Sequence, residues 1–372
     1  MANSNCIYVS LIVLSVFFAS QAVNQTIKNN NNLWITSSFY MLLLTFSLIV
    51  GTRYMVGVDY PQYMSIIELG ERHYYYESME YLNRLLAELT YNMNLKFYWW
   101  FIFMAFVQIF FIAIAIKDNF KQVFPWIILC FFMLYMSFYL NGVRQGSALS
   151  CFICACSFIK DRKLFHYLTF IAIGTMFHKS ILIWSPMYWI VNREFLNNIK
   201  VQYTIFFCSI IILPILIKKI INVALPLLSI IGFEDQVASV IGQQEGIITI
   251  GSGLGVLLRY LRWLTIIAYY NKLKDFIGRE IFVPLYNLFF IGILFDAATM
   301  DIVNMSRMVM YCLIFEIFIL GSLFYYMTKT KNKLDRVIIF VLLIPNVILY
   351  IILPLFNGMI EWHTIWEAPY LI

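Results

Sequence analysis

The stretch Arg53-Tyr-Met-Val-Gly-Val-Asp-Tyr-Pro-Gln-Tyr63 lies where an apolar run ends and the longest polar interval of the sequence begins. It gathers an arginine, a glycine, an acid and three tyrosines at that boundary. A cluster of this kind at a membrane surface can bind a charged, polar ligand. The apolar runs around it decide whether there is a membrane, and on which side of it the stretch lies.

The composition is that of a membrane protein. Of the 372 residues, 62% are apolar and 12% are charged, whereas soluble domains have about 25% charged residues. The net charge of +6 reflects basic loops, since no Lys/Arg-rich block is present, and we expect no nucleic-acid partner. The first apolar run, Cys6–Val23, lacks a basic n-region, so we interpret it as a retained helix rather than a signal peptide.

Apolar runs of nearly spanning length follow one another along the chain, and a helix needs about 20 such residues to cross a bilayer. The runs are Cys6–Val23, Leu33–Gly51, Phe97–Ile116, Val123–Leu140, Gly142–Ile159, Leu164–Val191, Val201–Ile217, Gly253–Tyr270, Ile281–Thr299, Arg307–Met327 and Val337–Leu353. They predict one all-α polytopic membrane domain over residues 1–372, with about 11–12 transmembrane helices.

Lysines and arginines in short loops indicate the cytoplasmic side. The basic loops are 160–163, 272–279, 329–336 and, more weakly, the pair Lys117 and Lys121. All of them fall on one side only if the run 164–191 forms two half-length helices, Leu164–Phe177 and Ser180–Val191. We therefore expect a break near His178 and Lys179, and an N-terminus outside the cytoplasm.

This topology places the polar intervals 52–96 and 218–252 on the outer face. Leucines at helical spacing predict an amphipathic surface helix over Glu77–Thr90, and Ile220–Ile231 is a second candidate. The glycine-rich stretch 242–255 lacks a phosphate-loop lysine in the right place and is interpreted as an outer loop or lid.

Cysteines do not predict a metal site here. Cys151, Cys154 and Cys156 have metal-like spacing, but they lie in an apolar run where a free cysteine behaves as a small hydrophobic residue. Metal binding needs converging ligands such as a second cluster or a histidine. We expect neither a metal nor a cofactor.

Arg144 is the sharpest candidate for chemistry, because it opens an otherwise apolar helix and a charge there is costly. A guanidinium matches phosphate oxygens two at a time, and the alternative is that Arg144 extends to the lipid interface. Arg307 opens another apolar helix, so the two arginines would suit a diphosphate. An ion pair with Asp296 or Asp301 is the alternative for Arg307.

Arg259 and Arg262 lie near the outer end of another predicted span. We interpret them as anchors of that helix at the lipid interface, with a contribution to the basic pocket as the alternative.

An acid and a histidine complete the candidates. Asp59 could accept the proton of a sugar hydroxyl, and Tyr60 and Tyr63 beside it could stack on sugar faces. A loop aspartate that bonds nearby amides is the alternative, and Asp296 and Asp301 are rival bases. His178 could exchange protons or donate to a phosphate, although a single histidine is more often structural.

Several motifs resemble those of the EpsG family of polysaccharide-polymerising membrane proteins. The stretch Arg53–Tyr63 is similar to its opening motif. Asn141-Gly-Val-Arg-Gln-Gly-Ser-Ala148 is similar to its Arg-Gln-Gly turn, and Ala172–Leu182 to its Phe-His motif with a serine two residues on. Ser306-Arg307 before an apolar run and Ala368-Pro369-Tyr370 also resemble that family.

The resemblance implies a Wzy-type polymerase of O-antigen, capsule or exopolysaccharide in a bacterial inner membrane. Such a membrane glycosyltransferase joins undecaprenyl-diphosphate-linked oligosaccharides at the periplasmic face, and a chain-length regulator is a candidate partner. Arg144 and Arg307 would then hold the leaving diphosphate, Asp59 would be the base and His178 would orient a phosphate or assist the base. The expected substrate-binding residues are Arg53, Tyr60, Tyr63, Gln145, Lys179 and Asp301.

Other functions remain open at this point. A flippase of lipid-linked sugar would need charges along a path across the membrane, whereas here they gather at one face. A glycosyltransferase that uses a polyprenyl-phosphate sugar would have a similar outer pocket. A non-catalytic scaffold would tolerate loss of Arg144 and of the Asp59 charge.

Overall fold

The computed structural model describes residues 2–30, 32–116, 118–230, 253–299, 303–352 and 362–366. The chain forms two compact units. Unit 1 is Met1–Trp189 with Leu320–Ile372, and unit 2 is Ile190–Ile319. Asp301, Pro354, the Ala368–Tyr370 motif and nearly all of the glycine-rich stretch 242–255 lie outside the described residues.

Unit 1 contains most of the elements. In chain order they are α1 (Ala2–Asn29), η1 (Leu33–Ile35), α2 (Ser37–Gly51), β1 (Arg53–Tyr54), α3 (Tyr60–Leu69), η2 (Gly70–Arg72), α4 (Tyr81–Asn92), α5 (Tyr98–Ile114), η3 (Asp118–Val123), α6 (Phe124–Leu134), α7 (Met136–Asn141), α8 (Val143–Cys156), α9 (Leu164–Phe177), η4 (Lys179–Trp184), α10 (Met187–Ile190), α18 (Lys333–Val347), η5 (Ile348–Ile352) and β2 (His363–Thr364).

Unit 2 is built from fewer and longer helices. They are α11 (Ile199–Ile230), α13 (Leu254–Ala268), α14 (Tyr270–Ile277), α15 (Arg279–Thr299), α16 (Val303–Leu313) and the start of α17 (Glu316–Lys329), which continues into unit 1. The expected second surface helix over Ile220–Ile231 is not separate, because α11 runs through it. Only Lys218 and Lys219 separate the two predicted segments, and lysine has a good helix propensity.

The predicted fold class is confirmed, since every predicted apolar run forms a helix or consecutive helices. Within the described residues, four helices are long and apolar enough to span a membrane: Cys6–Asn29, Ile199–Leu216, Arg279–Ala297 and Lys333–Ile352. A pair bent by 41°, Met305–Leu313 with Glu316–Lys329, makes a fifth, and four more apolar helices are shorter. Several of the expected spans are therefore short or broken.

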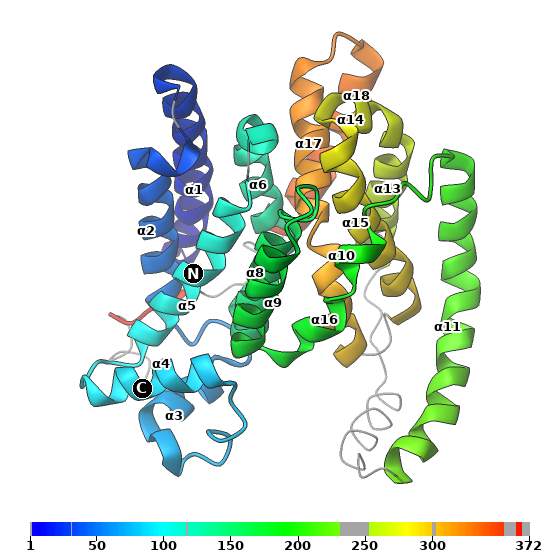
Figure 1. Cartoon of the computed structure of the whole chain (residues 1–372). Coiled ribbons are helices and arrows are strands. Elements are labelled where there is room, and N and C mark those ends of the chain that lie inside the picture. The colour runs from blue at the N-terminus through cyan, green and yellow to red at the C-terminus, as the bar shows by residue number, and fades with distance from the viewer. Residues whose placement is uncertain are drawn as a thin grey trace. The chain divides into compact units, whose positions relative to one another are not determined.

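Helix α8 forms the centre of unit 1. Each of its residues except Arg144 is buried, and α5 and α9 pack along it (Figure 1). Gly174 lets α9 approach closely, because a Cβ there would collide with Ile181 and lie 3.1 Å from the Cβ of Cys151. The three cysteines of α8 are buried free thiols within this packing, as expected of small apolar residues.

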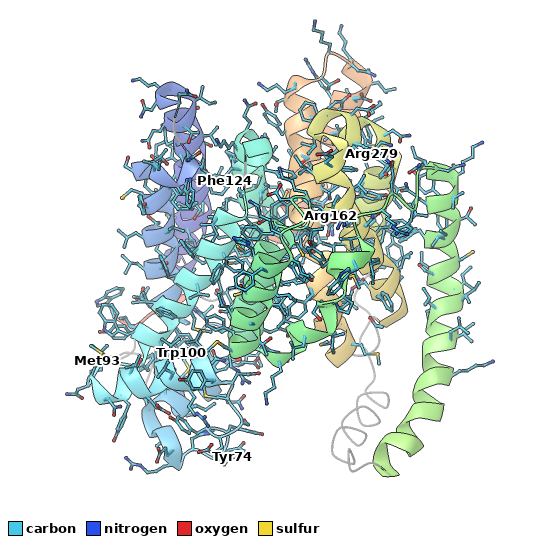
Figure 2. The ribbon with its side chains drawn as sticks, viewed as in Figure 1. Tyr74, Met93, Trp100, Phe124, Arg162 and Arg279 are labelled. Carbon is cyan, nitrogen blue, oxygen red and sulfur yellow. The ribbon has the colours of Figure 1, made fainter. Side chains whose placement is uncertain are left out.

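The expected surface helix is present as α4, which lies across one end of the unit 1 helices beside α3 (Figure 1). Tyr74 and Trp100 lie at this end, and Phe124 lies toward the other (Figure 2). The face of α4 that packs on unit 1 is polar or small, with Asn83, Ala87 and Thr90 buried. The leucine face is not buried by the described residues and remains suited to a membrane surface.

The break predicted at His178 is confirmed, but the regular helix predicted over Ser180–Val191 is wrong. His178 has an extended backbone (φ −159°, ψ 123°) and caps the 3-10 helix η4, which is followed by the short α10. Pro186 explains the second interruption, since it has no N–H to continue a helix and is tolerated only in a first turn.

A two-stranded antiparallel ribbon joins the opening motif to the tail of unit 1. Arg53 pairs with Thr364 and Tyr54 with His363, and the Ile365 N–H donates to the carbonyl of Thr52 at 3.0 Å. The tail is therefore held at the end of α2, where the polar interval begins.

The interpretation of Arg259 and Arg262 as lipid anchors is wrong. Arg262 is 2% exposed, and its Nε donates to Oε1 of Glu316 at 2.6 Å. Arg259 pairs with Asp296 at 3.1 Å, and Trp263 Nε1 also donates to Glu316. Their spacing of three residues puts both arginines on one helix face, and that face meets acids of unit 2 rather than lipid.

Glu194 connects residues 192–200, which the predicted topology also places in the cytoplasm, with the basic loop 272–279. Its carboxylate accepts hydrogen bonds from Lys274 at 2.7 Å, from Arg279 at 2.7 Å and from the Tyr270 hydroxyl at 2.9 Å. Residues near 194 and 274 thus lie at one end of unit 2, as the loop charges predict. Burial raises the pKa of Glu194, but the hydrogen bonds from Lys274 and Tyr270 outweigh it and leave the pKa below its ordinary value.

Glu194→Gln is expected to lower the apparent melting temperature of the purified protein at neutral pH, because charged hydrogen bonds contribute about 1.5–3 kcal/mol each. A carboxyl with a lowered folded-state pKa stabilises above its unfolded pKa, and this stability is lost as the pH falls through the folded value. The difference between wild type and variant should therefore shrink below pH 4.5. Asp275→Asn is the control, because Asp275 lies on α14 next to Lys274 and is exposed; equal effects of both changes would contradict this account.

Candidate functional site

Arg53 is buried and holds the opening motif in place through hydrogen bonds; we call Arg53 with the carbonyls that it binds the Arg53 frame. It is 1% exposed, and its guanidinium donates to the carbonyls of Val56 (3.2 Å), Val50 (2.7 Å) and Leu140 (3.2 Å). A buried charge is tolerated only when it is paired or hydrogen-bonded, and these carbonyls supply that compensation. Burial lowers the pKa of Arg53 to about 10, so it remains charged at neutral pH.

Tyr60 belongs to the same frame. Its hydroxyl donates to the carbonyl of Arg53 at 2.8 Å, and its ring stacks on Phe101 at 4.5 Å between centroids. Tyr60 is 0% exposed. The guanidinium of Arg53 and the hydroxyl of Tyr60 both bond to backbone carbonyls, so these two residues hold the opening motif in place. Their contact with a substrate stays a prediction.

Gly57 and Asn141 join the first motif to the second. The N–H of Val58 donates to Asn141 Oδ1 at 2.6 Å. Gly57 has φ +107°, and a Cβ there would lie 2.8 Å from the carbonyl oxygen of Leu140. Only glycine fits this conformation and this approach without strain. The start of α8, and with it Arg144, is therefore positioned by the opening motif.

Arg144 is oriented by residues of the polar interval 52–96. Its Nη1 donates to Glu80 Oε2 at 2.8 Å, and its Cζ lies 5.7 Å from the centroid of the Tyr63 ring. The side chain of Arg144 is 26% exposed and that of Glu80 is 9% exposed. The Nε of Arg144 is buried and has no hydrogen-bond partner among the described residues. An incompletely satisfied guanidinium can bind an oxyanion with two parallel hydrogen bonds.

Asn83 ties α4 to the break after α9. Asn83 is 0% exposed, and its Nδ2 donates to the carbonyl of Phe177 at 2.7 Å and to Glu80 Oε2 at 3.4 Å. Trp100 Nε1 donates to the carbonyl of Asn83 at 3.4 Å. We call Tyr63, Glu80, Asn83 and Arg144 the Arg144 cluster. It lies against the residue that precedes His178.

The geometry also fixes the tautomer of a neutral His178. The N–H of Ser180 donates to His178 Nδ1 at 3.2 Å, and the Ser180 hydroxyl lies 2.7 Å from the same nitrogen. An Nδ1 that accepts from an N–H carries no proton, so the proton of a neutral ring is on Nε2. His178 thus has two roles: its Nδ1 caps η4, and its Nε2 carries the proton of the neutral ring and can donate it in a hydrogen bond.

The remaining candidates are placed as follows. Asp59 precedes α3, makes no capping hydrogen bond, and is close enough to Tyr63 to act on it electrostatically. Gln145 is buried in α8, and Lys179 is exposed beside the break. Arg307 is an exposed residue of unit 2.

Tyr63 supplies a neutral donor beside Arg144. Burial raises the pKa of Tyr63 more than the neighbouring Arg144 lowers it, so the phenol is protonated at neutral pH. Among the described residues, no group of three or more His, Cys, Asp or Glu side chains could hold a metal ion. The chemistry that the cluster itself offers is charged and neutral hydrogen bonding to an anion.

The sequence reasoning missed Glu80 and Asn83 as members of the site. Both lie among the leucines of the amphipathic helix expected over Glu77–Thr90, on its polar side, and such a side is usually solvated. The sequence did contain a signal for a buried polar face. Asn83, Ala87 and Thr90 recur at helical spacing and form a continuous face of small and polar side chains. Such a face can bury against charged residues as readily as it can face water.

The comparisons with known proteins agree with the motifs. A family model described as the EpsG family matches residues 34–364. No curated protein and no solved structure matches the chain. The matched range contains the opening motif, the Arg144 cluster and the break at His178.

Gly57→Ala is expected to lower the apparent melting temperature, because it adds backbone strain of about 1–3 kcal/mol and a collision with the Leu140 carbonyl. Gly278→Ala is the matched control, since Gly278 has φ +100° but a Cβ there would meet nothing within 4 Å. Thermal unfolding of both variants separates collision from strain. Equal losses would show that the approach of Gly57 to Leu140 contributes nothing.

Proposed function

Because the chain belongs to the EpsG family, whose members are membrane proteins of polysaccharide biosynthesis, we propose that it is a glycosyltransferase that polymerises oligosaccharide repeat units. Its substrates would be oligosaccharides linked to undecaprenyl diphosphate, and its product O-antigen, capsule or exopolysaccharide. The reaction would take place at the periplasmic face of a bacterial inner membrane. A chain-length regulator remains a predicted partner.

The observation that supports this proposal is the incomplete hydrogen bonding of the Arg144 guanidinium. The residue opens a buried helix and, among the residues that the structure describes, pairs with one carboxylate from another element and keeps a buried Nε without a partner. A purely structural arginine such as Arg53 satisfies its donors on backbone carbonyls. The contrast between these two arginines of unit 1 favours a ligand-binding role for Arg144.

The proposed reaction is a glycosyl transfer. A hydroxyl oxygen of the acceptor unit attacks the anomeric carbon of the donor chain, and the bond from that carbon to the diphosphate oxygen breaks. The electron pair leaves with the diphosphate, and the hydroxyl proton passes to a base. Arg144 would stabilise the charge that develops on the leaving group, which is where fixed donors accelerate a reaction most.

Other residues have supporting roles in this proposal. Asp59, which makes no capping hydrogen bond, is assigned as the base. His178 would donate its Nε2 proton to a phosphate oxygen, and the exposed Lys179 would attract the anionic carrier. Tyr63 would donate beside Arg144. Arg307 with Asp301 stays a prediction for a second diphosphate contact, and Gln145 for support within α8.

Arg144→Ala is expected to abolish long-chain polysaccharide while the protein still inserts, because removal of one stabilising donor costs about 10²–10³ in rate. The assay is a gel of polysaccharide from a deletion strain complemented with each variant. Arg84→Ala is the matched control, since Arg84 lies on α4 and makes an exposed pair with Glu77 at 2.9 Å. Exposed pairs contribute about 0–1 kcal/mol, so Arg84→Ala should give a normal ladder.

A normal ladder from Arg144→Ala would refute the polymerase mechanism and favour a scaffold. Loss of every sugar-bearing species in the deletion strain would indicate an earlier step of synthesis. Retention of a single capped repeat unit is the result that a polymerase predicts.

Glu80→Gln tests whether orientation of Arg144 matters. The amide keeps the size and one acceptor but removes the charge, so we expect a partial loss of turnover with little change in the substrate KM. A merely structural role would instead lower the protein yield without changing activity per molecule. The measurement is turnover of lipid-linked repeat units by purified protein, normalised to folded protein.

A further inference from the structure

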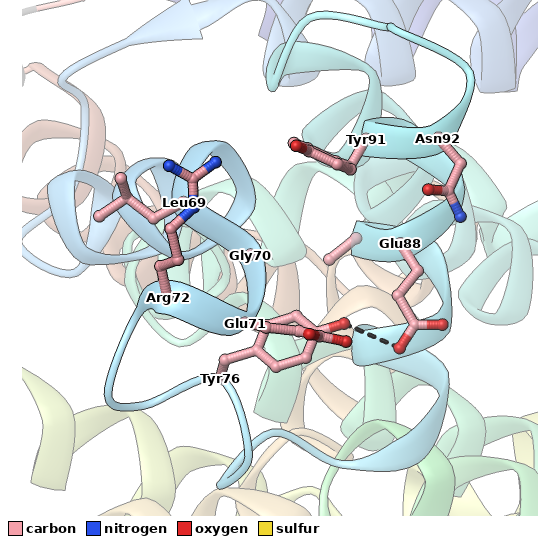
Figure 3. A pocket seen from close by; sticks show the side chains of 9 residues that line it. Leu69, Gly70, Glu71, Arg72, Tyr76, Glu88, Tyr91 and Asn92 are labelled. Carbon is pink, nitrogen blue, oxygen red and sulfur yellow. Dashed lines mark hydrogen bonds between the residues drawn. The ribbon is translucent and has the colours of Figure 1, made fainter.

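A polar cavity lies in the interval 52–96, between the end of α3 and the second half of α4. It has a volume of 430 Å³, and the side chains used below are Glu71, Arg72, Tyr76, Glu88, Tyr91 and Asn92 (Figure 3). This volume falls within the ~300–1,000 Å³ of small-molecule sites. None of these residues belongs to the Arg144 cluster.

Local sequence explains why the cavity exists. Helix α3 ends at Gly70, whose φ of 55° and ψ of −133° suit only glycine. The chain then turns back, and η2 faces α4 across the cavity (Figure 3). Tyr76, 3% exposed, donates its hydroxyl to Glu88 Oε1 at 2.8 Å. That bond fixes one wall and leaves the second oxygen of Glu88 as an acceptor.

The lining is suited to hydroxyl groups. Glu71 and Glu88 offer acceptors, Arg72 offers donors, and the Asn92 amide offers both. Tyr91 is 56% exposed, and its ring gives an apolar face with a polar tip. A sugar presents the same mixture, because each hydroxyl donates and accepts while the ring carbons form apolar faces.

The charge of the lining disfavours other ligands. Two carboxylates against one guanidinium give a net negative site, which repels phosphate. The described residues contain no group of ligands for a metal ion, and a guanidinium in the wall would repel a cation. A neutral polyol remains the chemistry that fits.

The cavity also lies at a useful distance from Arg144. On α4 the cavity is lined by residues from Ala87 to Asn92, which are seven to twelve residues beyond Glu80 and thus about 10–18 Å from it along the helix axis. A ligand in the cavity would therefore lie several sugar rings from a diphosphate held by Arg144. We infer that this cavity is a carbohydrate subsite that holds the saccharide chain of the substrate away from the reacting bond. The inference rests on the proposed function for the identity of that chain.

The test measures binding directly, with full-length protein in lipid nanodiscs. The probe is the surface polysaccharide of the source cell, freed of lipid by mild acid and sized into short fragments. Saturation-transfer NMR should detect binding to wild type. Tyr91→Ala and Glu88→Gln should each raise the Kd about tenfold, the effect of losing one good contact.

The control is Tyr81→Ala. Tyr81 is also on α4 and is 57% exposed, almost the same as Tyr91, but it does not line the cavity. Its loss should leave the Kd unchanged. No binding by wild type, wild-type affinity in both cavity variants, or an equal loss with Tyr81→Ala would each overturn the subsite.

Failure of the subsite and failure of the polymerase assignment are distinguishable. Arg144→Ala should bind the fragments with wild-type affinity and make no polymer. In cells, Tyr91→Ala should still form the first linkages but give a shorter ladder. Normal ladders from Arg144→Ala would refute the polymerase and leave the NMR result to decide the cavity.

Discussion

The burial of the Arg53 guanidinium is the constraint on which the site depends. A charge without water must have acceptors, and those it finds belong to the end of α2, to the loop that follows and to the end of α7. Satisfying one side chain thus brings together segments 87 residues apart in the chain. The close approach of Gly57 to Leu140 and the bond from Val58 to Asn141 join the same two segments.

The frame matters because it fixes where α8 begins. Arg144 is its second residue, so the position of the helix start sets the position of the guanidinium. Glu80, at the start of α4, then compensates the charge when no anion is present. Asn83 of α4 bonds to the carbonyl of Phe177 and so holds α4 to the break at His178. A single carboxylate leaves donor capacity on Arg144 for an oxyanion, whereas a fully satisfied guanidinium would have none.

The sequence predicts the membrane class, the apolar runs and the break at His178, because these depend on local hydropathy and on loop charge. It also predicts one site that gathers the opening motif with Arg144, His178 and Arg307; the structure brings Tyr63 next to Arg144 and has Arg307 in unit 2. It does not predict that Arg53 is satisfied by backbone carbonyls, or that Arg262 pairs with Glu316, since these contacts join segments far apart in the chain. A carboxylate within an apolar run, as at Glu316, was the available signal.

The Arg144 cluster and the cavity between α3 and α4 have different physical tasks. Contacts to a sugar chain far from the reacting bond are the same before and during reaction, so they favour binding without accelerating the chemical step. In the proposed reaction, contacts of Arg144 to a diphosphate would strengthen as charge develops there, and these would lower the barrier. Helix α4 carries Glu80 at one end and Tyr91 near the other. One rigid element can therefore set the spacing between a bound saccharide and the leaving group, which is what repeated addition to a growing chain requires.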